Sequence, residues 1–221
     1  MDNNTGNPQA FDLSPEMLDE IQTNIEEIIK SFPISESNKL DVIKKINFMY
    51  SHTRHLSVTD ALTGLYNRRH FENTIEREFL RAKRYSNDLS IAILDVDFFK
   101  KINDSYGHLC GDYALKEIAY LALQTFRKTD FVFRYGGEEI VVILTETPMA
   151  SAIIPLERLR KAVENYPFNY DCKSFQVTIS IGTETLREEH QTPEELLEQA
   201  DKALYAAKEG GRNRVVTASD I

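Results

Sequence analysis

The stretch from Arg134 to Ile140, which reads Arg-Tyr-Gly-Gly-Glu-Glu-Ile, is the feature that most constrains the fold of this chain. Apolar residues alternate on both sides of the two glycines, which is the two-residue period of β-strands. The pattern predicts two strands joined by a tight hairpin turn, whose positive φ angles glycine adopts without steric cost. Glu138 and Glu139 follow the turn, and strand alternation would point them to opposite faces. A structural hairpin gains nothing from that pair, whereas metal-dependent phosphate chemistry uses one.

The hydrophobic pattern elsewhere predicts an α+β sandwich. It gives, in order, a helix at about 67–85, a strand at 89–96, a helix at about 111–126, the hairpin at 131–144, a helix at about 149–165, a strand at 175–183, a helix at about 193–207 and a strand at 214–218. Without the first helix, the core is the ferredoxin-like βαββαβ arrangement, in which the second hairpin strand lies antiparallel beside the first strand. Asp95, which ends the first strand, should therefore lie near Glu138, which opens the third.

The N-terminal segment predicts a hairpin of two helices. Residues 1–10 are polar and are expected to be disordered. Ser14 and Pro15 mark a helix start, Pro33 ends that helix, and a second helix is expected at about 39–56. Apolar residues recur at steps of three and four: Met17, Leu18, Ile21, Ile25, Ile28 and Ile29, then Leu40, Ile43, Ile46, Met49 or Tyr50, and Leu56. Two helices bury such stripes poorly alone, so we expect a partner, either the following domain or a second chain, and favour the second chain.

Composition excludes several classes of function. The net charge of −9 and the pI near 5.1 argue against binding to a nucleic acid polymer, which needs a basic face. No apolar run approaches the roughly 18 residues of a membrane span, and the first residues do not resemble a signal peptide. Cys110 and Cys172 have no metal-ligand spacing and are expected to be reduced thiols of a cytoplasmic protein.

Further motifs occur in a fixed order around the hairpin. They are Asp60-Ala61-Leu62-Thr63-Gly64-Leu65-Tyr66-Asn67-Arg68-Arg69, Asp95-Val96-Asp97-Phe98-Phe99-Lys100, Asn103-Asp104-Ser105-Tyr106-Gly107-His108 with Gly111-Asp112, and Lys208 through Arg212-Asn213-Arg214. With the hairpin motif they resemble the GGDEF family, the diguanylate cyclases, over residues 58–217, with Ile140 where the family usually has Phe. The resemblance implies a palm-type GGDEF domain at 58–221, preceded by a helical dimerisation or regulatory segment at 1–57.

The resemblance also implies an activity, the condensation of two GTP molecules into cyclic di-GMP with release of two pyrophosphates. The reaction would depend on Mg²⁺ or Mn²⁺, held by Asp95, the backbone carbonyl of Val96 and Glu138, because such ions prefer hard oxygen ligands. Glu138 or Glu139 is implied as the base that takes the hydroxyl proton, and we favour Glu138, with Glu139 supporting the metal site. A metal-bound carboxylate is a poor base, so metal-assisted deprotonation is an equally good account.

The residues after the first strand are candidates for binding the triphosphate. The backbone N–H groups of Phe98 and Phe99 would cradle the β- and γ-phosphates, as a turn of amides does for anions. By resemblance, Lys100, Lys208 and Arg212 neutralise the phosphate charge. The run that contains Lys208 is also typical of an ordinary helix C-terminus, and both readings can hold together.

Two residues match the positions that recognise guanine. Asn103 and Asp112 are these residues, and a carboxylate can accept both donors on the guanine Watson–Crick edge, which adenine lacks. The alternative is that Asp112 is only a helix N-cap after Gly111. His108 lies in the same loop and is either a substrate contact or a structural residue.

A second binding site is implied immediately before the hairpin. Arg127 and Asp130 match the RxxD inhibitory site, where cyclic di-GMP binds, and Arg158 falls where the family has a further product-binding arginine. An arginine fork suits phosphate and the guanine Hoogsteen edge. The alternative is a surface Arg–Asp pair that contributes little. Because each domain holds one GTP and the product needs two, a homodimer is also expected.

Two other functions are weaker alternatives. A degenerate domain on this fold would bind GTP or cyclic di-GMP as a receptor, but such domains lose the hairpin carboxylates or the metal aspartate, and this chain keeps them. An adenylyl or mixed-nucleotide cyclase is disfavoured by Asp112. Residues 1–57 contain no recognisable sensor pocket, so the sequence does not indicate the input signal.

Overall fold

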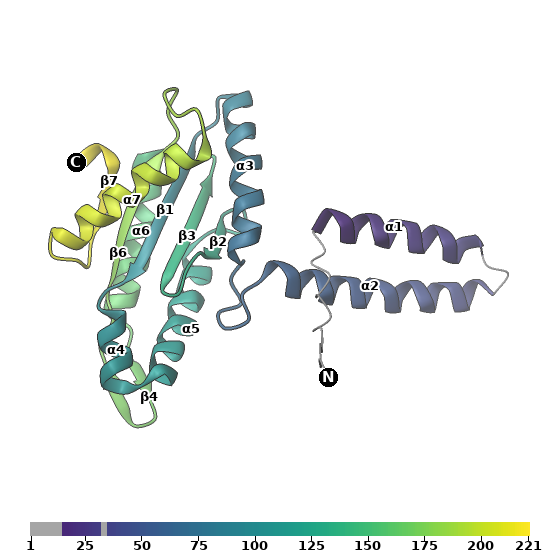
Figure 1. Ribbon diagram of the computed structural model, residues 1–221, viewed down its shortest axis with the longest axis horizontal. Helices are drawn as coiled ribbons and strands as arrows, with labels where there is room; N and C mark the ends of the chain where they lie inside the picture. The colour runs from purple at the N-terminus through teal and green to yellow at the C-terminus, as the bar shows by residue number, and fades with distance from the viewer. Residues whose placement is uncertain (1–14, 32–34) are drawn as a thin grey trace, which may run out of the picture. The chain divides into compact units, whose positions relative to one another are not determined.

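The computed structural model describes residues 15–31 and 35–221, apart from the side chains of residues 15–18, 36 and 50–57. The chain divides into two compact units, Met1–Thr59 and Asp60–Ile221 (Figure 1). Within the described ranges, no helix is both long and apolar enough to cross a membrane.

The first unit is a hairpin of two helices, α1 (Pro15–Ser31) and α2 (Glu36–Val58). The Gln22 side chain donates a hydrogen bond from Nε2 to Oδ1 of Asn47 at 2.6 Å, and Lys39 Nζ donates to a carbonyl near the end of α1 at 3.1 Å. These contacts join the two helices along their length, which confirms the predicted helical hairpin (Figure 1).

Much of the apolar surface of this hairpin stays exposed. The exposed large side chains are Ile21, Ile28, Leu40, Val42, Phe48 and Met49, with exposed fractions from 38% to 75%. The expected disorder at 1–10, the cap at Ser14 and the break at Pro33 lie outside the described residues. The described part of the hairpin therefore keeps apolar area that two helices alone do not bury.

The second unit is built on one mixed sheet. Its elements are α3 (Arg68–Tyr85), β1 (Leu89–Val96), α4 (Phe99–Tyr106), α5 (His108–Thr125), β2 (Phe131–Arg134), β3 (Glu139–Thr145), α6 (Met149–Glu164), β4 (Phe168–Tyr170), β5 (Lys173–Phe175), β6 (Ile179–Thr185), α7 (Pro193–Glu209), β7 (Val215–Thr217) and the 3-10 turn η1 (Ala218–Asp220). The strand order in the five-stranded sheet is β2-β3-β1-β6-β7, and β4 pairs only with β5. β3 lies antiparallel beside β1, which confirms the predicted insertion of the second hairpin strand.

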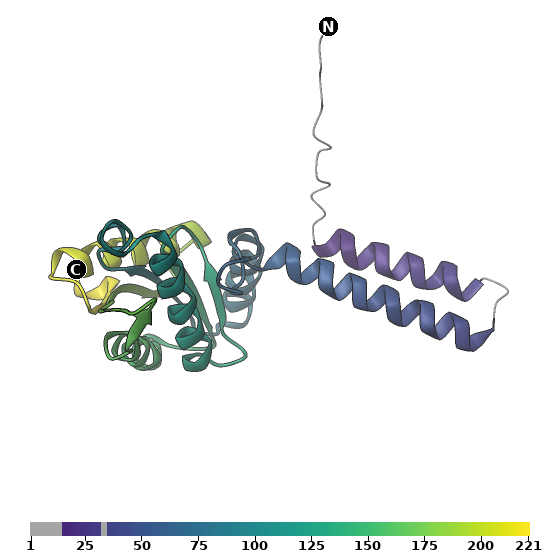
Figure 2. The same ribbon diagram turned by 90° about the horizontal axis from the view of Figure 1, so that it is seen from below.

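Helices cover both faces of this sheet and give the unit two cores (Figures 1 and 2). Because side chains alternate along β1, Leu94 packs with α5 and α6 on one face, whereas Ile91 and Ile93 pack with α3 and α7 on the other. This confirms the α+β sandwich that the hydrophobic periods predict. It also means that odd-numbered residues near the end of β1 face α7.

Three short elements, α4, β4 and β5, were not predicted, and two longer elements, α5 and β6, begin at other residues than predicted. The helix α4 was not expected, and α5 begins at His108 rather than near residue 111. The strand expected at 175–183 is instead β6, which begins at Ile179, and it is preceded by the small β4–β5 hairpin. Asp171 and Cys172 form the turn of that hairpin, with φ angles of +48° and +59°. Elements of three residues are too short to show a hydrophobic period, which is why the sequence did not reveal them.

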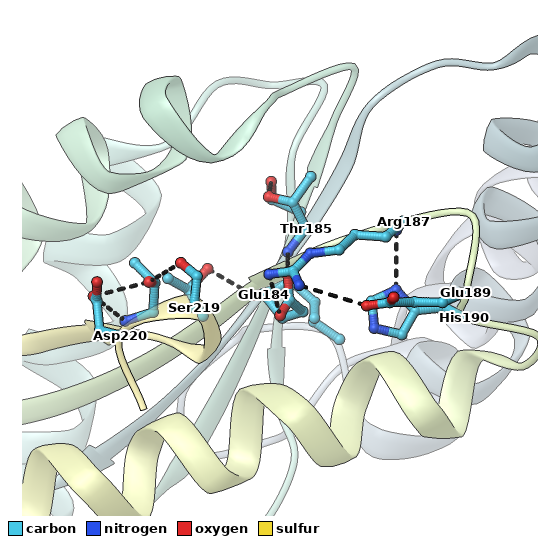
Figure 3. A network of polar contacts seen from close by, with 11 residues as sticks. Glu184, Thr185, Arg187, Glu189, His190, Ser219 and Asp220 are labelled. Atoms are coloured by element: carbon cyan, nitrogen blue, oxygen red, sulfur yellow. Dashed lines mark hydrogen bonds and ion pairs between the residues drawn. The ribbon is translucent and has the colours of Figure 1, made fainter.

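A polar network fixes the segment that leads from β6 into α7. The Arg187 guanidinium lies 3.2 Å from Oε2 of the buried Glu184, and its backbone N–H donates to Nδ1 of His190 at 2.9 Å (Figure 3). Because β7 runs parallel to β6, the 3-10 turn η1 follows at the same end of the sheet, where the Asp220 carboxylate accepts a hydrogen bond from the Thr217 backbone N–H at 3.1 Å (Figure 3). These contacts hold both ends of the segment that contains α7, and the last turn of α7 carries Lys208.

Candidate active site

Two carboxylates and an ammonium group meet where β1 and β3 lie side by side. The sheet register pairs Asp95 with Glu139. Lys208 forms an ion pair with Asp95, with 2.9 Å between Nζ and Oδ2, and the Asp95 side chain is only 12% exposed. Asp201, also on α7, adds a negative charge that acts on Glu139. Several acids and one paired cation therefore gather where the end of β1 and the start of β3 lie under α7.

The structure corrects which glutamate pairs with Asp95. Topology alone was expected to bring Glu138 to this aspartate, but β3 begins at Glu139, and Glu139 is the register partner. Glu138 lies in the loop immediately before the strand, so the expected alternation of the two glutamates along a strand does not apply to it. The two carboxylates remain neighbours in the chain, and Glu138 is partly exposed.

The turn itself also differs from the prediction. Residues 135–138 separate β2 from β3, and neither Gly136 nor Gly137 has a positive φ. The backbone N–H groups of Tyr135 and Gly136 both donate to the Glu139 carbonyl, at 2.9 and 3.3 Å, so the reversal is spread over four residues and none needs the left-handed region. A Cβ on Gly136 would lie 2.4 Å from Oε2 of Glu139, whereas one on Gly137 would meet nothing within 4 Å. The first glycine leaves room for the carboxylate, and the second borders open space.

Arg134 ties this loop to the start of the domain. Its NH2 group donates to the Gly137 carbonyl at 2.9 Å, and its NH1 group donates to Oδ1 of Asp60 at 2.9 Å. Asp60 also accepts hydrogen bonds from the backbone and hydroxyl of Thr63. Burial alone would raise the pKa of Asp60, but the bonds from Thr63 and Arg134 together hold it below its ordinary value. The loop conformation is thus fixed by a partly buried ion pair.

Burial disfavours the charged forms of the two paired carboxylates, Asp95 and Glu139. It raises the pKa of Asp95 above its ordinary value despite the opposing effect of Lys208. Burial also raises the pKa of Glu139, and the charge of Asp95 adds to that increase. Groups with shifted pKa values that gather in one place are typical of functional sites.

The donor set fits a hard divalent cation. Among the described residues, no group of three or more His, Cys, Asp or Glu side chains forms a complete metal cage. Mg²⁺, however, uses one or two carboxylates and completes its coordination with substrate phosphates and water. Asp95 and Glu139 are two clustered carboxylates whose mutual repulsion a cation would relieve, and Val96 and Glu138 adjoin them in the chain.

The residues predicted to bind phosphate lie at the start of α4 and at the end of α7. Phe98 is the N-cap of α4 in a left-handed conformation, with φ of +56°, and the amides of the first turn of a helix are free to bind an anion. The Arg212 guanidinium lies over the Phe98 ring, 4.4 Å from its centroid. Lys100 is exposed in the first turn of α4. Lys208 instead forms an ion pair with Asp95, so it also offsets the charge of that carboxylate.

The two predicted guanine-recognition residues lie on adjacent helices, Asn103 on α4 and Asp112 on α5. Oδ1 of Asn103 is buried against Gly111 and has no hydrogen-bond partner among the described residues. A Cβ on Gly111 would lie 2.0 Å from this atom, so only glycine permits this approach. Gly107 is the N-cap of α5, and Asp112 is therefore inside the helix, which excludes the N-cap alternative. His108 is exposed at the first position of α5.

The residues predicted for product binding also lie near one another. The Asp130 carboxylate accepts a hydrogen bond from the backbone N–H of Arg127 at 2.9 Å, so the turn is closed through the backbone rather than by a guanidinium–carboxylate pair. Burial raises the pKa of Asp130 despite the opposing hydrogen bonds from the backbone of Arg127 and Thr145. Arg158 donates from α6 to the Thr125 carbonyl, two residues before Arg127. Arg127 is exposed and lines a cavity of about 410 Å³ between α3 and the β2–β3 hairpin.

Sequence reasoning missed three residues at this site. Asp201 and the pair Arg134–Asp60 act on the carboxylates or on the loop that carries them. Asp60 and Arg134 are both inside the quoted motifs, so their positions gave a signal that was not used. Asp201 gave none, because its proximity follows only from the packing of α7 on the sheet.

The fold and the site together define a class, an α+β palm domain that gathers acids and cations at one end of its sheet. The chain belongs to the GGDEF family, whose model, described as diguanylate cyclase, GGDEF domain, matches residues 57–214. It therefore carries a diguanylate cyclase domain, as the sequence motifs predict.

Individual relatives agree with this assignment. The response regulator PleD of Caulobacter vibrioides is 44% identical over 167 residues, which cover 75% of this chain and 37% of PleD. Diguanylate cyclase DgcP of Pseudomonas aeruginosa is 43% identical over 165 residues, which cover 75% of this chain and 24% of DgcP. The chain thus matches well under half the length of either relative.

Solved structures show the same similarity. The GGDEF domain of DgcB from Caulobacter crescentus, crystallised in complex with c-di-GMP, has a TM-score of 0.71 and 32% identity, covering 74% of this chain and 96% of that chain. Diguanylate cyclase SiaD from Pseudomonas aeruginosa, crystallised with its activator SiaC, has a TM-score of 0.71 and 31% identity, covering 91% of this chain and 79% of that chain.

Proposed function

We propose that this chain is an active diguanylate cyclase, which condenses two GTP molecules into cyclic di-GMP and releases two pyrophosphates. The observation that supports it most is the pairing of Asp95 with Glu139, with Lys208 bonded to Asp95 at 2.9 Å. Preorganised charges at one point favour a reaction in which negative charge develops on the phosphate and the leaving group. Glu138 adjoins the pair, so none of the carboxylates expected for turnover is missing.

In this proposal the carboxylates hold Mg²⁺ or Mn²⁺. The ligands would be Asp95, Glu138 and the Val96 carbonyl, with Glu139 beside them. When bound, the ion stabilises negative charge on the phosphate and lowers the pKa of an attacking hydroxyl. Glu138 takes the hydroxyl proton. The raised pKa of Glu139 makes it the second candidate for that base, because a base works best when its pKa approaches the working pH.

The remaining site residues bind and select GTP. Asp112 accepts the two Watson–Crick donors of guanine, and Asn103, on the adjacent helix α4, is a second contact to the base. The amides of Phe98 and Phe99, with Lys100, Lys208 and Arg212, bind the triphosphate, and His108 is a further substrate contact. A cytoplasmic location agrees with this substrate and with the free thiols Cys110 and Cys172.

The active unit is a homodimer in this account. One domain holds one GTP, and the product contains two, so two half-sites must face each other. The exposed apolar side chains of α1 and α2 support association of this hairpin with the same hairpin of a second chain. A tether of this kind raises the effective concentration of one half-site near the other.

Product feedback is the last part of the proposal. Cyclic di-GMP would bind with Arg127, Asp130 and Arg158 and slow the reaction. The exposed Arg127 beside a cavity supports this, because its guanidinium can contact a ligand. The domain of DgcB, to which this chain is similar, was crystallised with c-di-GMP.

The direct test is incubation of the purified chain with GTP and Mg²⁺, with the products separated by chromatography. We expect cyclic di-GMP and pyrophosphate, no cyclic product from ATP, and no product when a chelator removes the metal. The competing function is a receptor that binds GTP or cyclic di-GMP without turnover. Tight nucleotide binding with no cyclic product at any protein concentration would establish the receptor and exclude the cyclase.

A further inference from the structure

The loop between α7 and β7 has an unusual backbone. Gly211, Arg212 and Asn213 have φ angles of +112°, +64° and +47° in succession. Glycine adopts this region freely and asparagine tolerates it, but arginine does so at a cost. Such a run persists only where the surrounding structure determines it, and it is typical of functional sites. The question is what holds Arg212 in this conformation.

The side chain and backbone of Asn213 are held by three different partners. Its backbone N–H donates to Oδ2 of Asp97 at 3.1 Å. Its Oδ1 accepts from NH1 of Arg160 at 2.8 Å, and its Nδ2 donates to Oε1 of Glu164 at 2.6 Å. The three partners come from the end of β1 and from α6, so the loop is attached to two separate elements of the domain.

Those partners are themselves fixed. Arg160 has a side chain only 11% exposed and also bonds Glu157 and Glu164, both at 2.9 Å. Asp97 is 4% exposed and accepts hydrogen bonds from the hydroxyls of Thr178 and Ser180, both at 2.7 Å. Because neither partner can move without breaking other bonds, Asn213 has little freedom. We call Asn213 with Asp97, Arg160 and Glu164 the Asn213 clamp.

The clamp determines where the preceding residue points. Arg212 is bonded through its backbone N–H to the Ala207 carbonyl at 3.0 Å. Its guanidinium lies 4.4 Å from the centroid of the Phe98 ring, at the amino end of α4. That end is where the free amides of the first turn favour an anion. Arg212 is therefore presented to the position where the phosphates of a nucleotide would lie.

We propose that Asn213 is a positioning residue for triphosphate binding. Its clamp fixes the left-handed backbone that directs Arg212 toward the amino end of α4. Without the clamp, Arg212 is still present, but its guanidinium is no longer held at the amino end of α4. This inference rests on the proposed function, because it takes the ligand to be the triphosphate of GTP.

The test uses titration calorimetry with Mg²⁺ and compares the affinity for GMP with that for GTP, the latter measured with 3′-deoxy-GTP, which lacks the attacking hydroxyl and is not consumed. Asn213→Gly keeps the ability to adopt a positive φ and keeps the backbone N–H, but removes both side-chain bonds. We expect it to weaken GTP binding about tenfold and to change GMP binding by less than about twofold, because an arginine–phosphate contact is charge-assisted. Arg212→Ala should have the same effect, and the double variant should be no weaker than Arg212→Ala alone.

Two further variants complete the design. Asn169→Gly is the matched control, since Asn169 is exposed and its side chain bonds only the nearby Pro167 carbonyl, at 3.0 Å. It should leave both affinities unchanged. Glu164→Ala removes, from an exposed position, one of the two side-chain bonds of Asn213 and one bond of Arg160, so it should weaken GTP binding in the same direction but less, even where Asn213→Gly melts too early to be measured.

The outcomes separate this inference from the proposed function. If the wild-type chain makes cyclic di-GMP but Asn213→Gly and Glu164→Ala keep its ratio of GTP to GMP affinity, the inference is wrong and the cyclase stands. Losses that add in the double variant also overturn it, because Asn213 would then act independently of Arg212. If the wild-type chain binds GTP no more tightly than GMP, the inference is wrong, and if it also forms no cyclic di-GMP, the proposed function is wrong as well.

Discussion

Glu139 lies in the signature loop (residues 134–140), in an environment that disfavours its charged form. Burial raises its pKa, and the facing Asp95 raises it further. A carboxylate held in this way costs stability at neutral pH and is useful only if a cation or a proton transfer makes use of it. Glu139 is therefore expected to lower the stability of the metal-free domain while it contributes to the proposed function.

Replacement of Glu139 by Gln should stabilise the metal-free domain at pH 7. The pKa of Glu139 in the folded state lies above its ordinary value of 4.5. Between pH 4.5 and that higher folded-state pKa, the folded chain therefore binds more protons than the unfolded chain. Stability consequently falls as the pH rises through that window. Glu139→Gln removes this loss, and its advantage should vanish near pH 4, where both states are protonated. Thermal melts at pH 7 and pH 4 measure this, with the exposed Glu76→Gln as control. A lower melting temperature of Glu139→Gln at pH 7 would contradict the assignment.

Asp112 should determine the choice of nucleotide. Asp112→Ser replaces a carboxylate that accepts two hydrogen bonds with a hydroxyl that cannot accept both in the same geometry. We expect the ratio of kcat/KM for GTP to that for ATP to fall about tenfold or more. Glu117→Ser, further along α5, is unsuitable as a control because Glu117 bonds Tyr166, whereas the exposed Lys116→Ser is suitable. An unchanged ratio would mean that Asp112 does not recognise the base.

At this scale the sequence indicated which residues lie at the site but not how they pair. Strand order in a βαββαβ core follows from the hydrophobic periods and brought Asp95 and the glutamates together, whereas the ion pair of Lys208 with Asp95 was not predicted. The partner of Asp95 depends on register, and a shift of one residue exchanged Glu138 for Glu139. The expected positive φ of the glycines failed for a similar reason, since the turn is longer than two residues.

Long elements were predictable, and short ones were not. The helices α3, α5, α6 and α7 and the strands β1 and β3 have periods of sufficient length to identify them. The eight-residue α4 and the three-residue β4 and β5 do not. The helix α4 matters for function, because its start carries the backbone amides that are proposed to bind phosphate. Its single buried hydrophobic residue, Ile102, gives little periodic signal.

The turn between α5 and β2 should act as a separate binding element. Arg127→Ala should raise the concentration of cyclic di-GMP that halves the activity by about tenfold or more, because it removes a charge-assisted phosphate contact. The KM for GTP should change little. Initial rates at increasing product concentration measure both, and Lys128→Ala, exposed in the same turn, is the control. Product inhibition that is identical in Arg127→Ala and the wild type would reduce this turn to a structural role.

The whole molecule consists of two units that have different tasks in this account. The second unit has two well-packed cores and carries all the proposed chemistry. The first unit exposes apolar side chains on two helices and carries none of it. The resemblance to the GGDEF family implied this division near residue 57, and the structure divides the chain at residues 59 and 60.

Removal of residues 1–56 should leave a folded, largely monomeric domain. Because free domains must meet by diffusion, its specific activity should be low at nanomolar concentration and should rise steeply with concentration, whereas the full chain should vary much less. Light scattering gives the oligomeric state, and initial rates across a dilution series give the activity. Equal specific activity of both proteins at the same low concentration would show that the helices do not provide dimerisation.

The central claim is that the acids at the end of the sheet perform turnover rather than simply bind a nucleotide. The most direct measurement compares the wild-type chain with Asp95→Asn, recording GTP affinity and the rate of cyclic di-GMP formation separately. We predict that the wild type forms cyclic di-GMP and that Asp95→Asn loses about a hundredfold or more of the rate, because it removes a metal oxygen and a charge. Its GTP affinity should change far less. Full activity of Asp95→Asn, or a wild-type chain that binds GTP and forms no product, would contradict the account.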